Sequence, residues 1–175
     1  MRHIGSQGLS IIKLSESLQL AAYLCPAGKL TIGYGHVIQP MDCGLFAMPV
    51  EQLRSIIKTN QDARKIKIPL HITTQQADRL LDRDTAQTAL FIASVTKPPL
   101  TQGQFDALCS LAFNIGQGNY AASTLRKKVA AGDFAGAAAE FDRWVYATVN
   151  GKKVKLGGLV TRRAAERRLF EGGGA

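Results

Sequence analysis

The stretch SESLQLAAYLCPAGKLTIGYGH, residues 15–36, gives the clearest indication of this chain's fold and chemistry. It places a carboxylate, Glu16, at the end of an amphipathic segment. A thiol, Cys25, and a hydroxyl, Thr31, then follow on opposite sides of a turn. If these three side chains converge, they supply an acid, a base or nucleophile, and a group that positions water. That combination suits a hydrolytic reaction.

The tetrapeptide CPAG, residues 25–28, is typical of a type I turn. Proline fixes φ at the second position of such a turn, and glycine suits the fourth. We expect the turn to join a short strand around Tyr23 to a second strand over residues 29–34. Two glycines, Gly33 and Gly35, would then allow another element or a ligand to approach the backbone closely.

An amphipathic helix is expected to begin near Ser6, because Leu9, Ile12 and Glu16 follow at helical spacing. Glu16 therefore continues an apolar stripe. A carboxyl group held against apolar side chains has its charged form disfavoured, which suits a general acid at neutral pH. The alternative is a glutamate at the helix end that turns into water.

The rest of the chain is mainly helical in pattern. Capping boxes at residues 73–76 and 101–104 begin two of the helices. Apolar spacing predicts helices at residues 50–58, 73–97, 101–116, 123–131, 133–144 and 160–170. Residues 37–70 start as an irregular, insertion-like segment, and residues 150–158 read as a glycine-bearing connection. The sum is an α+β fold, mainly α, with one small β-hairpin lobe.

Length and composition fit one soluble domain of 175 residues. The N-terminus lacks the apolar core of a signal peptide, and no apolar run is long enough to span a bilayer, so we expect accumulation in the cytosol. The three cysteines are expected to be free thiols. Cys109 lies among apolar residues and reads as an inert core residue, and no Cys/His spacing indicates a zinc site.

The formal net charge of +9 implies an anionic partner: nucleic acid, lipid headgroups or an acidic polymer such as a bacterial envelope. The basic segment at residues 64–67 reads as a solvated face or connector, or alternatively as a contact with wall or membrane. No RNA- or DNA-binding motif accompanies the charge, so nucleic-acid binding is not expected.

At this spacing, Glu16, Cys25 and Thr31, followed by IGYGH at residues 32–36, resemble the catalytic signature of the phage-type lysozymes. These are muramidase endolysins that cleave the glycan strands of peptidoglycan. The resemblance continues in the blocks at residues 100–116, 123–128 and 158–170, and it covers most of the chain outside residues 38–70. It implies a lysozyme-like, two-lobed single domain over residues 1–175. Residues 21–70 would form the small lobe, residues 1–20 and 71–175 the helical lobe, with a long connecting helix and a substrate cleft.

The resemblance also implies site roles. Glu16 would be the general acid and Thr31 would orient the attacking water. Many family members carry Asp where this chain has Cys25, so the thiol is either a base or water-positioning group or a nucleophile. Arg162 would orient Glu16. The substrate-binding residues would be Val37, Phe113 and Ser123. This scheme needs no metal or organic cofactor.

The function implied is hydrolysis of the β-1,4 bond between N-acetylmuramic acid and N-acetylglucosamine, causing host cell lysis. The partners would be peptidoglycan strands and, through the basic surface, the anionic envelope. A monomer would be made in the host bacterial cytoplasm and reach the wall through a phage holin.

Two alternatives stay open at this point. One is a lytic transglycosylase. The other is a cationic wall-binding or membrane-perturbing protein, suggested by four arginines in the last helix: Arg162, Arg163, Arg167 and Arg168. Two further residues lie near the signature. Asp42 is an additional candidate carboxylate or a solvated loop residue, and His36 reads as a local structural hydrogen-bonding group rather than a catalyst.

Overall fold

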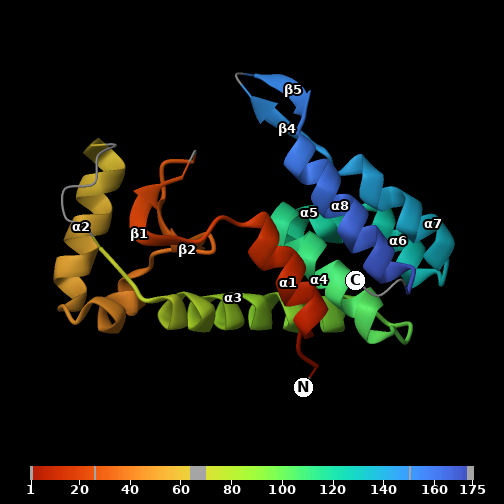
Figure 1. The fold of residues 1–175 in the computed structure, drawn as a ribbon, viewed down its shortest axis with the longest axis horizontal. Helices are drawn as coiled ribbons and strands as arrows, with labels where there is room; N and C mark the ends of the chain where they lie inside the picture. The colour runs from red at the N-terminus through yellow and green to blue at the C-terminus, as the bar shows by residue number, and fades with distance from the viewer. Residues whose placement is uncertain (1, 26, 64–69, 150, 173–175) are drawn as a thin grey trace. The chain divides into compact units, whose positions relative to one another are not determined.

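The computed structural model describes residues 2–25, 27–63, 70–149 and 151–172. The chain divides into two compact units (Figure 1): unit 1 is Met1–Ser15 with Thr85–Ala175, and unit 2 is Glu16–Asp84. The long helix α3, Thr74–Val95, contributes residues to both units. Among the described residues, none of the helices combines the length and the apolar character needed to cross a bilayer.

Unit 1 is helical apart from one hairpin. Besides its part of α3 it contains α1 (Ser6–Ser15), α4 (Gln102–Ile115), α5 (Gln117–Ala122), α6 (Thr124–Ala130), α7 (Phe134–Glu140), a short 3-10 helix η2 (Phe141–Arg143), strands β4 (Tyr146–Val149) and β5 (Lys152–Lys155), and α8 (Gly157–Phe170). Helix α4 is the central element and contacts α1, α5 and α8. Its residues 105–112 are all buried, so it is enclosed on every side.

Unit 2 is built on a three-stranded antiparallel sheet in the order β1 (Gln19–Leu24), β2 (Leu30–Gly33), β3 (His36–Val37). A 3-10 helix η1 (Pro40–Phe46), helix α2 (Val50–Ala63) and the first part of α3 complete it. Leu30 and Ile32 point from β2 into a core with Leu53 of α2 and Leu80 of α3. This unit therefore has its own apolar core.

Local sequence signals are confirmed where capping and turn chemistry are strong. Helix α1 begins at Ser6, and the β1–β2 hairpin forms around the expected turn. Both capping boxes are present: in the second, Gln104 N–H donates to Thr101 Oγ1 at 3.2 Å and Thr101 N–H to Gln104 Oε1 at 2.9 Å. The predicted turn type depends on Pro26, which lies outside the described residues. The predicted basic segment, residues 64–67, also lies outside them.

Several boundaries differ from expectation. Residues 150–158 are not a plain connection, because Lys152–Lys155 pairs with Tyr146–Val149 as an antiparallel hairpin, and α8 begins at Gly157 instead of Val160. The helix expected over residues 133–144 is the shorter α7 followed by η2. Residues 40–46 form the 3-10 helix η1 where an irregular segment was expected. Helix α5 was not anticipated, because glycines flank and interrupt it.

Candidate active site

The β1–β2 hairpin of unit 2 carries the thiol and the hydroxyl. Tyr23 pairs directly with Thr31, so their side chains project from the same face of the sheet, opposite the face of Leu30 and Ile32. Thr31 is buried, at 2% exposure. Cys25 follows β1 directly, where its N–H donates to Lys29 O at 2.9 Å and its carbonyl accepts from Gly28 N at 2.7 Å. The turn thereby fixes the thiol beside Thr31.

The surroundings of Cys25 favour its thiolate. Partial burial acts to raise the pKa of this thiol, but the Lys29 backbone N–H, the Thr31 hydroxyl, the Ala27 backbone N–H and the Lys29 ammonium act in the opposite direction, and the pKa is lowered overall. Thr31 Oγ1 also lies 3.0 Å from Lys29 O. Because a hydroxyl carries one proton, it donates either to that carbonyl or to the sulfur.

Glu16 lies one residue beyond α1, in a bend, and not within the helix. It is half-buried. A Cβ added to Gly35 would lie 3.8 Å from Glu16 Oε2, so the carboxylate approaches the β2–β3 turn. Gly35 has a φ of +87°, which favours glycine in its own right. Gly33 also has a positive φ, of +67°, so backbone conformation explains both glycines, and the neighbours of each lie at ordinary contact distance instead of the expected close approach.

Tyr23 interacts electrostatically with both Cys25 and Glu16. It was not identified as a site residue from the sequence. Burial raises the pKa of its phenol first, and the charges of Cys25 and Glu16 raise it further. Both anionic groups therefore lie within electrostatic reach of one ring. The available signal was register: a residue two positions before Cys25 and opposite Thr31 must share their face of the hairpin.

Arg162 is buried in unit 1 and is not the surface cation that a basic terminal helix suggests. Its Nε donates to Glu166 Oε1 at 3.1 Å, and its Nη2 reaches Ser110 O at 3.3 Å. Arg163, fully buried, also pairs with Glu166, with Nε 2.8 Å from Oε2. The cationic face expected on α8 is therefore wrong for two of its four arginines.

The expected substrate-binding residues lie in different settings. Val37 is half-buried on β3, and Phe113 is half-buried near the end of α4. Ser123 is the N-cap of α6: its Oγ accepts from Arg126 N at 3.0 Å and donates to Tyr120 O at 2.7 Å. Its hydroxyl is thus already used within the fold, and the substrate-binding roles of these residues stay predictions.

Asp42 is buried, so its interpretation as a solvated loop residue is wrong. Its Oδ2 lies 2.9 Å from His36 Nε2 and accepts from Gln39 N at 2.7 Å, and its Oδ1 accepts from Arg83 at 2.8 Å. His36 Nδ1 lies 2.8 Å from Asp84 Oδ2. The structural role expected for His36 is confirmed, since it joins η1 to α3.

Two carboxylates flank one imidazole ring in this cluster, so His36 donates from both nitrogens. Burial lowers the pKa of His36, but the hydrogen bonds to Asp42 and Asp84 and their charges outweigh it and raise that pKa to about 9. For Asp42, burial raises the pKa, while His36, Gln39 and Arg83 lower it to about 2. The 3.1 Å approach of Arg83 Nη2 to His36 Nε2 is then a contact between two donors that share Asp42.

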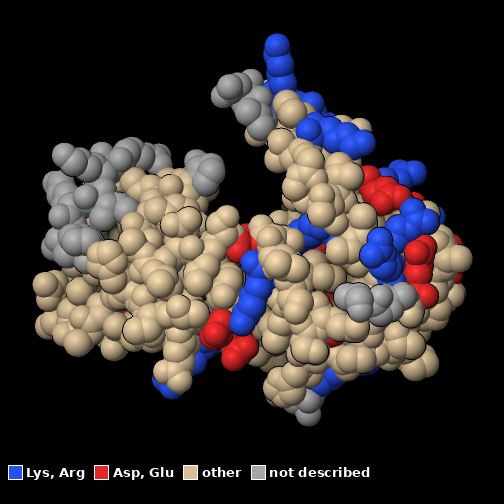
Figure 2. Space-filling model, viewed as in Figure 1, with Lys and Arg blue, Asp and Glu red and all other residues tan. Residues whose placement is uncertain are grey.

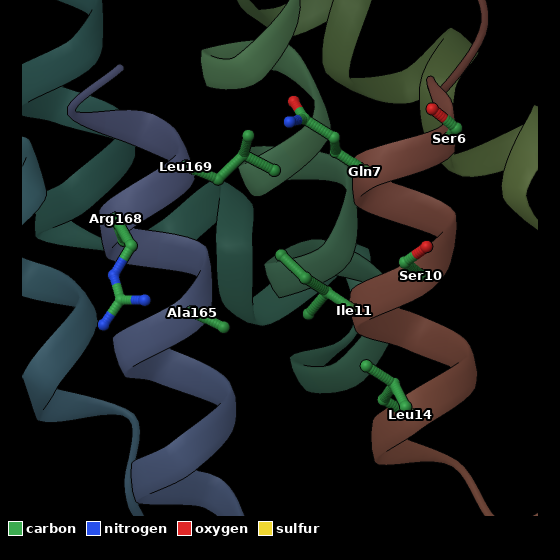
Figure 3. Close-up of a pocket in the computed structure, with 8 residues that line it drawn as sticks. All are labelled: Ser6, Gln7, Ser10, Ile11, Leu14, Ala165, Arg168 and Leu169. Carbon is green, nitrogen blue, oxygen red and sulfur yellow. The ribbon is translucent and has the colours of Figure 1, made fainter. Parts of the chain in front are cut away.

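A separate pocket of about 230 Å³ lies in unit 1 between α1 and α8 (Figure 3). Ile11 and Leu14 project from α1, and Ala165, Arg168 and Leu169 from α8. Its walls are mostly apolar, and its lining contains neither a carboxylate nor any of the expected site residues. It offers no acid–base chemistry. Across the described residues, no group of three or more His, Cys, Asp or Glu side chains could hold a metal ion.

Comparison with known proteins identifies the family. The sequence pattern of the family described as phage lysozyme matches residues 13–166. The endolysin of Acyrthosiphon pisum secondary endosymbiont phage 1 is 42% identical over 169 residues, covering 97% of this chain and 98% of that protein. The endolysin of Salmonella phage P22 is 32% identical, covering 97% and 99%.

Among solved structures, the muramidase domain of SpmX from Asticaccaulis excentricus superimposes with a TM-score of 0.76 at 32% identity, covering 97% of this chain and 98% of that one. The lysozyme-like, mainly helical α+β fold is confirmed by this likeness. The chain therefore belongs to the phage lysozyme family and is a lysozyme-type enzyme.

Proposed function

We propose that this protein hydrolyses the β-1,4 bond between N-acetylmuramic acid and N-acetylglucosamine in peptidoglycan. The observation that carries the proposal is that the β1–β2 hairpin brings Cys25 and Thr31 together, while Tyr23 of the same hairpin lies within electrostatic reach of both Cys25 and Glu16. An acid and a second, potentially anionic group are the minimum equipment of a glycosidase.

Glu16 acts as the general acid in this scheme. It protonates the glycosidic oxygen as the bond to the anomeric carbon breaks, which lets the leaving sugar depart as a neutral alcohol. Its half-buried position beside Gly35 supports this role, because a glycine there leaves space next to the carboxyl group for a substrate. We place Arg162 as a positioning residue and Val37, Phe113 and Ser123 as substrate contacts.

In this scheme Cys25 and Thr31 act on the face of the sugar ring opposite the leaving group. The lowered pKa of Cys25 supports a thiolate that accepts a proton from the attacking water, while the Thr31 hydroxyl orients that water. The alternative within the same site is direct attack by sulfur, with a covalent glycosyl-thioether intermediate that water then hydrolyses. Intact-protein mass spectrometry of a quenched reaction separates the two: only the second adds a glycan mass to the enzyme.

We further propose that the enzyme is made in the host bacterial cytoplasm as a monomer and acts on the cell wall after release. Two similar proteins, those of the aphid endosymbiont phage and phage P22, are named endolysins, which supports this course.

The decisive experiment is Glu16→Gln, assayed by release of reducing sugars from purified peptidoglycan. Loss of the only proton donor should reduce the rate by at least about 100-fold while the fold persists. Glu51→Gln is the matched control: it makes the same chemical change at an exposed glutamate of unit 2, and it should keep the parent rate. A Glu16→Gln protein as active as the control would refute the mechanism.

Mass spectrometry of the digested muropeptides identifies the reaction type. Hydrolysis ends in a reducing sugar, whereas a lytic transglycosylase leaves an anhydro sugar. Anhydro products from the parent enzyme would replace the proposed hydrolysis by transglycosylation. The anomeric configuration of the first product, read by NMR, then separates inversion from retention.

A further inference from the structure

The exposed, unpaired positive charge of unit 1 gathers on the β4–β5 hairpin more than on α8. On α8, Arg162 and Arg163 are buried against Glu166, and Arg167 pairs with Asp142 at 2.7 Å and Glu171 at 3.0 Å. By contrast, all residues of β5 are exposed, including Lys152, Lys153 and Lys155. No described carboxylate lies within ion-pairing distance of these three lysines.

Strand register sorts the hairpin into two unlike faces. Tyr146 pairs with Lys155 and Thr148 with Lys153, so these four side chains share one face. The ammonium of Lys153 lies 5.0 Å from the centre of the Tyr146 ring, which is 47% exposed. This face therefore combines an aromatic ring, a hydroxyl and two cations, all open to solvent. Figure 2 shows Lys and Arg side chains gathered over the hairpin.

We propose that this hairpin face is a second contact for the peptidoglycan strand, made by residues other than those of the hydrolytic site. The inference rests on the proposed function, because it extends that function to retention on the same polymer. Peptidoglycan carries carboxylates on its peptides and sugars with apolar ring faces. Lys153 and Lys155 match the first by charge, and the exposed ring of Tyr146 matches the second by stacking.

The hairpin fits a wall polymer better than a membrane. A membrane-binding element needs a broad apolar face that enters the acyl region. Here the opposite face offers Val154, at 40% exposure, next to the charge of Lys152. A contact of this kind holds the enzyme near its substrate between cleavage events, which raises the effective concentration of uncut bonds.

The test compares two double variants with equal change in net charge. The hairpin variant is Lys153→Gln, Lys155→Gln, which removes both cations of the proposed face; the control is Lys97→Gln, Lys127→Gln, two exposed lysines of unit 1 outside the hairpin. Both are made in the Glu16→Gln background, so that substrate is not consumed. Binding to purified, teichoic-acid-free peptidoglycan is measured by co-sedimentation over a range of salt concentrations, and circular dichroism checks the fold.

The hairpin variant should bind about tenfold more weakly at low salt, with a shallower salt dependence, while the control changes by less than about threefold. Amidation of the peptidoglycan carboxylates should weaken the parent and leave the hairpin variant almost unaffected. Equal losses in both variants, or parent-like binding by the hairpin variant, would overturn the inference. So would a loss confined to anionic lipid vesicles or DNA with binding to peptidoglycan intact.

Enzyme activity provides a measurement that is independent of the binding experiment. With Glu16 intact, the hairpin variant should release reducing ends from short soluble peptidoglycan fragments at the parent rate, and more slowly from insoluble walls. An equal slowing on both substrates would contradict a retention role. A parent enzyme inactive on both substrates would instead refute the proposed function. The binding experiment needs no catalysis, so its result would still be readable.

Discussion

The two units bury charge in different ways. In unit 1, Glu166 sits between two guanidinium groups, Arg162 and Arg163, with Ser110 Oγ donating at 2.6 Å. In unit 2, the central group is the imidazole of His36, held by Asp42 and Asp84. An arginine keeps its proton at any usable pH, whereas a histidine does not. The two guanidinium charges of the first cluster are thus fixed, whereas the imidazole charge at the centre of the second depends on pH.

This difference shows why two buried ionic clusters of similar geometry need not respond alike. Breaking a buried pair is costly because the remaining charge has no solvent and no partner. Arg163 and Glu166 are both fully buried, and the charge of the arginine does not titrate. His36 can lose its charge by titration alone, and then both flanking carboxylates lose one attraction.

The largest effect should come from Glu166→Gln. This change removes the carboxylate charge that both buried guanidinium groups contact, and it should lower the free energy of unfolding by about 3–5 kcal/mol. Urea denaturation followed by circular dichroism measures it. A loss below about 1 kcal/mol would mean that water or other groups compensate the arginines, and the contrast between the clusters would disappear.

Alkaline pH should weaken unit 2 through His36. The pKa of His36 is raised from 6.5 to about 9 in the folded state, so its contribution is fully present below pH 6.5. Between pH 6.5 and about 9 the unfolded chain releases its proton first, and up to about 3 kcal/mol is lost as pH rises. Urea midpoints from pH 6 to 9.5, with hydrogen exchange of β2 and η1 amides, measure the decline.

His36→Gln is the control for that decline. It should be less stable than the parent at pH 6 and should converge with it above pH 9, because the parent then carries a neutral ring. Parallel pH profiles for the two proteins would show that another group is responsible.

Acid should act on the same cluster through Asp42, with a somewhat smaller effect. The pKa of Asp42 is lowered from 3.8 to about 2, so its contribution is present above pH 3.8 and is lost as pH falls through about 2. The Asp42→Asn variant should lack this loss of stability between pH 3.8 and about 2, and it should be less stable than the parent at pH 5. A variant equally stable at pH 5 would contradict the structural importance of this carboxylate.

The smallest effect should come from Glu171→Gln. Glu171 pairs with Arg167 at 3.0 Å, but both side chains are exposed, at 48% and 39%. Surface pairs of this kind contribute little to stability, because solvent and salt screen them. Thermal or urea unfolding should therefore barely distinguish this variant from the parent. A loss approaching that of Glu166→Gln would show that burial is not what separates the two glutamates.

Part of the candidate site could be predicted because its determinants are local. Cys25 and Thr31 lie on either side of a short turn, so turn chemistry alone places them together. Burial of Asp42 and Arg162 could not be predicted, since their partners are 41 and 52 residues away in the sequence, at Arg83 and Ser110. Hydrophobic periodicity and composition do not indicate which distant residues pair.

The amino-acid sequence by itself determined the capped helices, the β1–β2 hairpin and the family signature, because side chain to backbone hydrogen bonds and alternating strands act over a few residues. Tertiary structure decided which charges are buried and which remain available. A basic terminal helix suggests surface arginines, yet two of the four in α8, Arg162 and Arg163, are buried with Glu166. Exposed positive charge gathers instead on the β4–β5 hairpin, because β5 projects three lysines that no described carboxylate reaches. Composition sets the net charge, but packing decides which charged side chains can contact a partner.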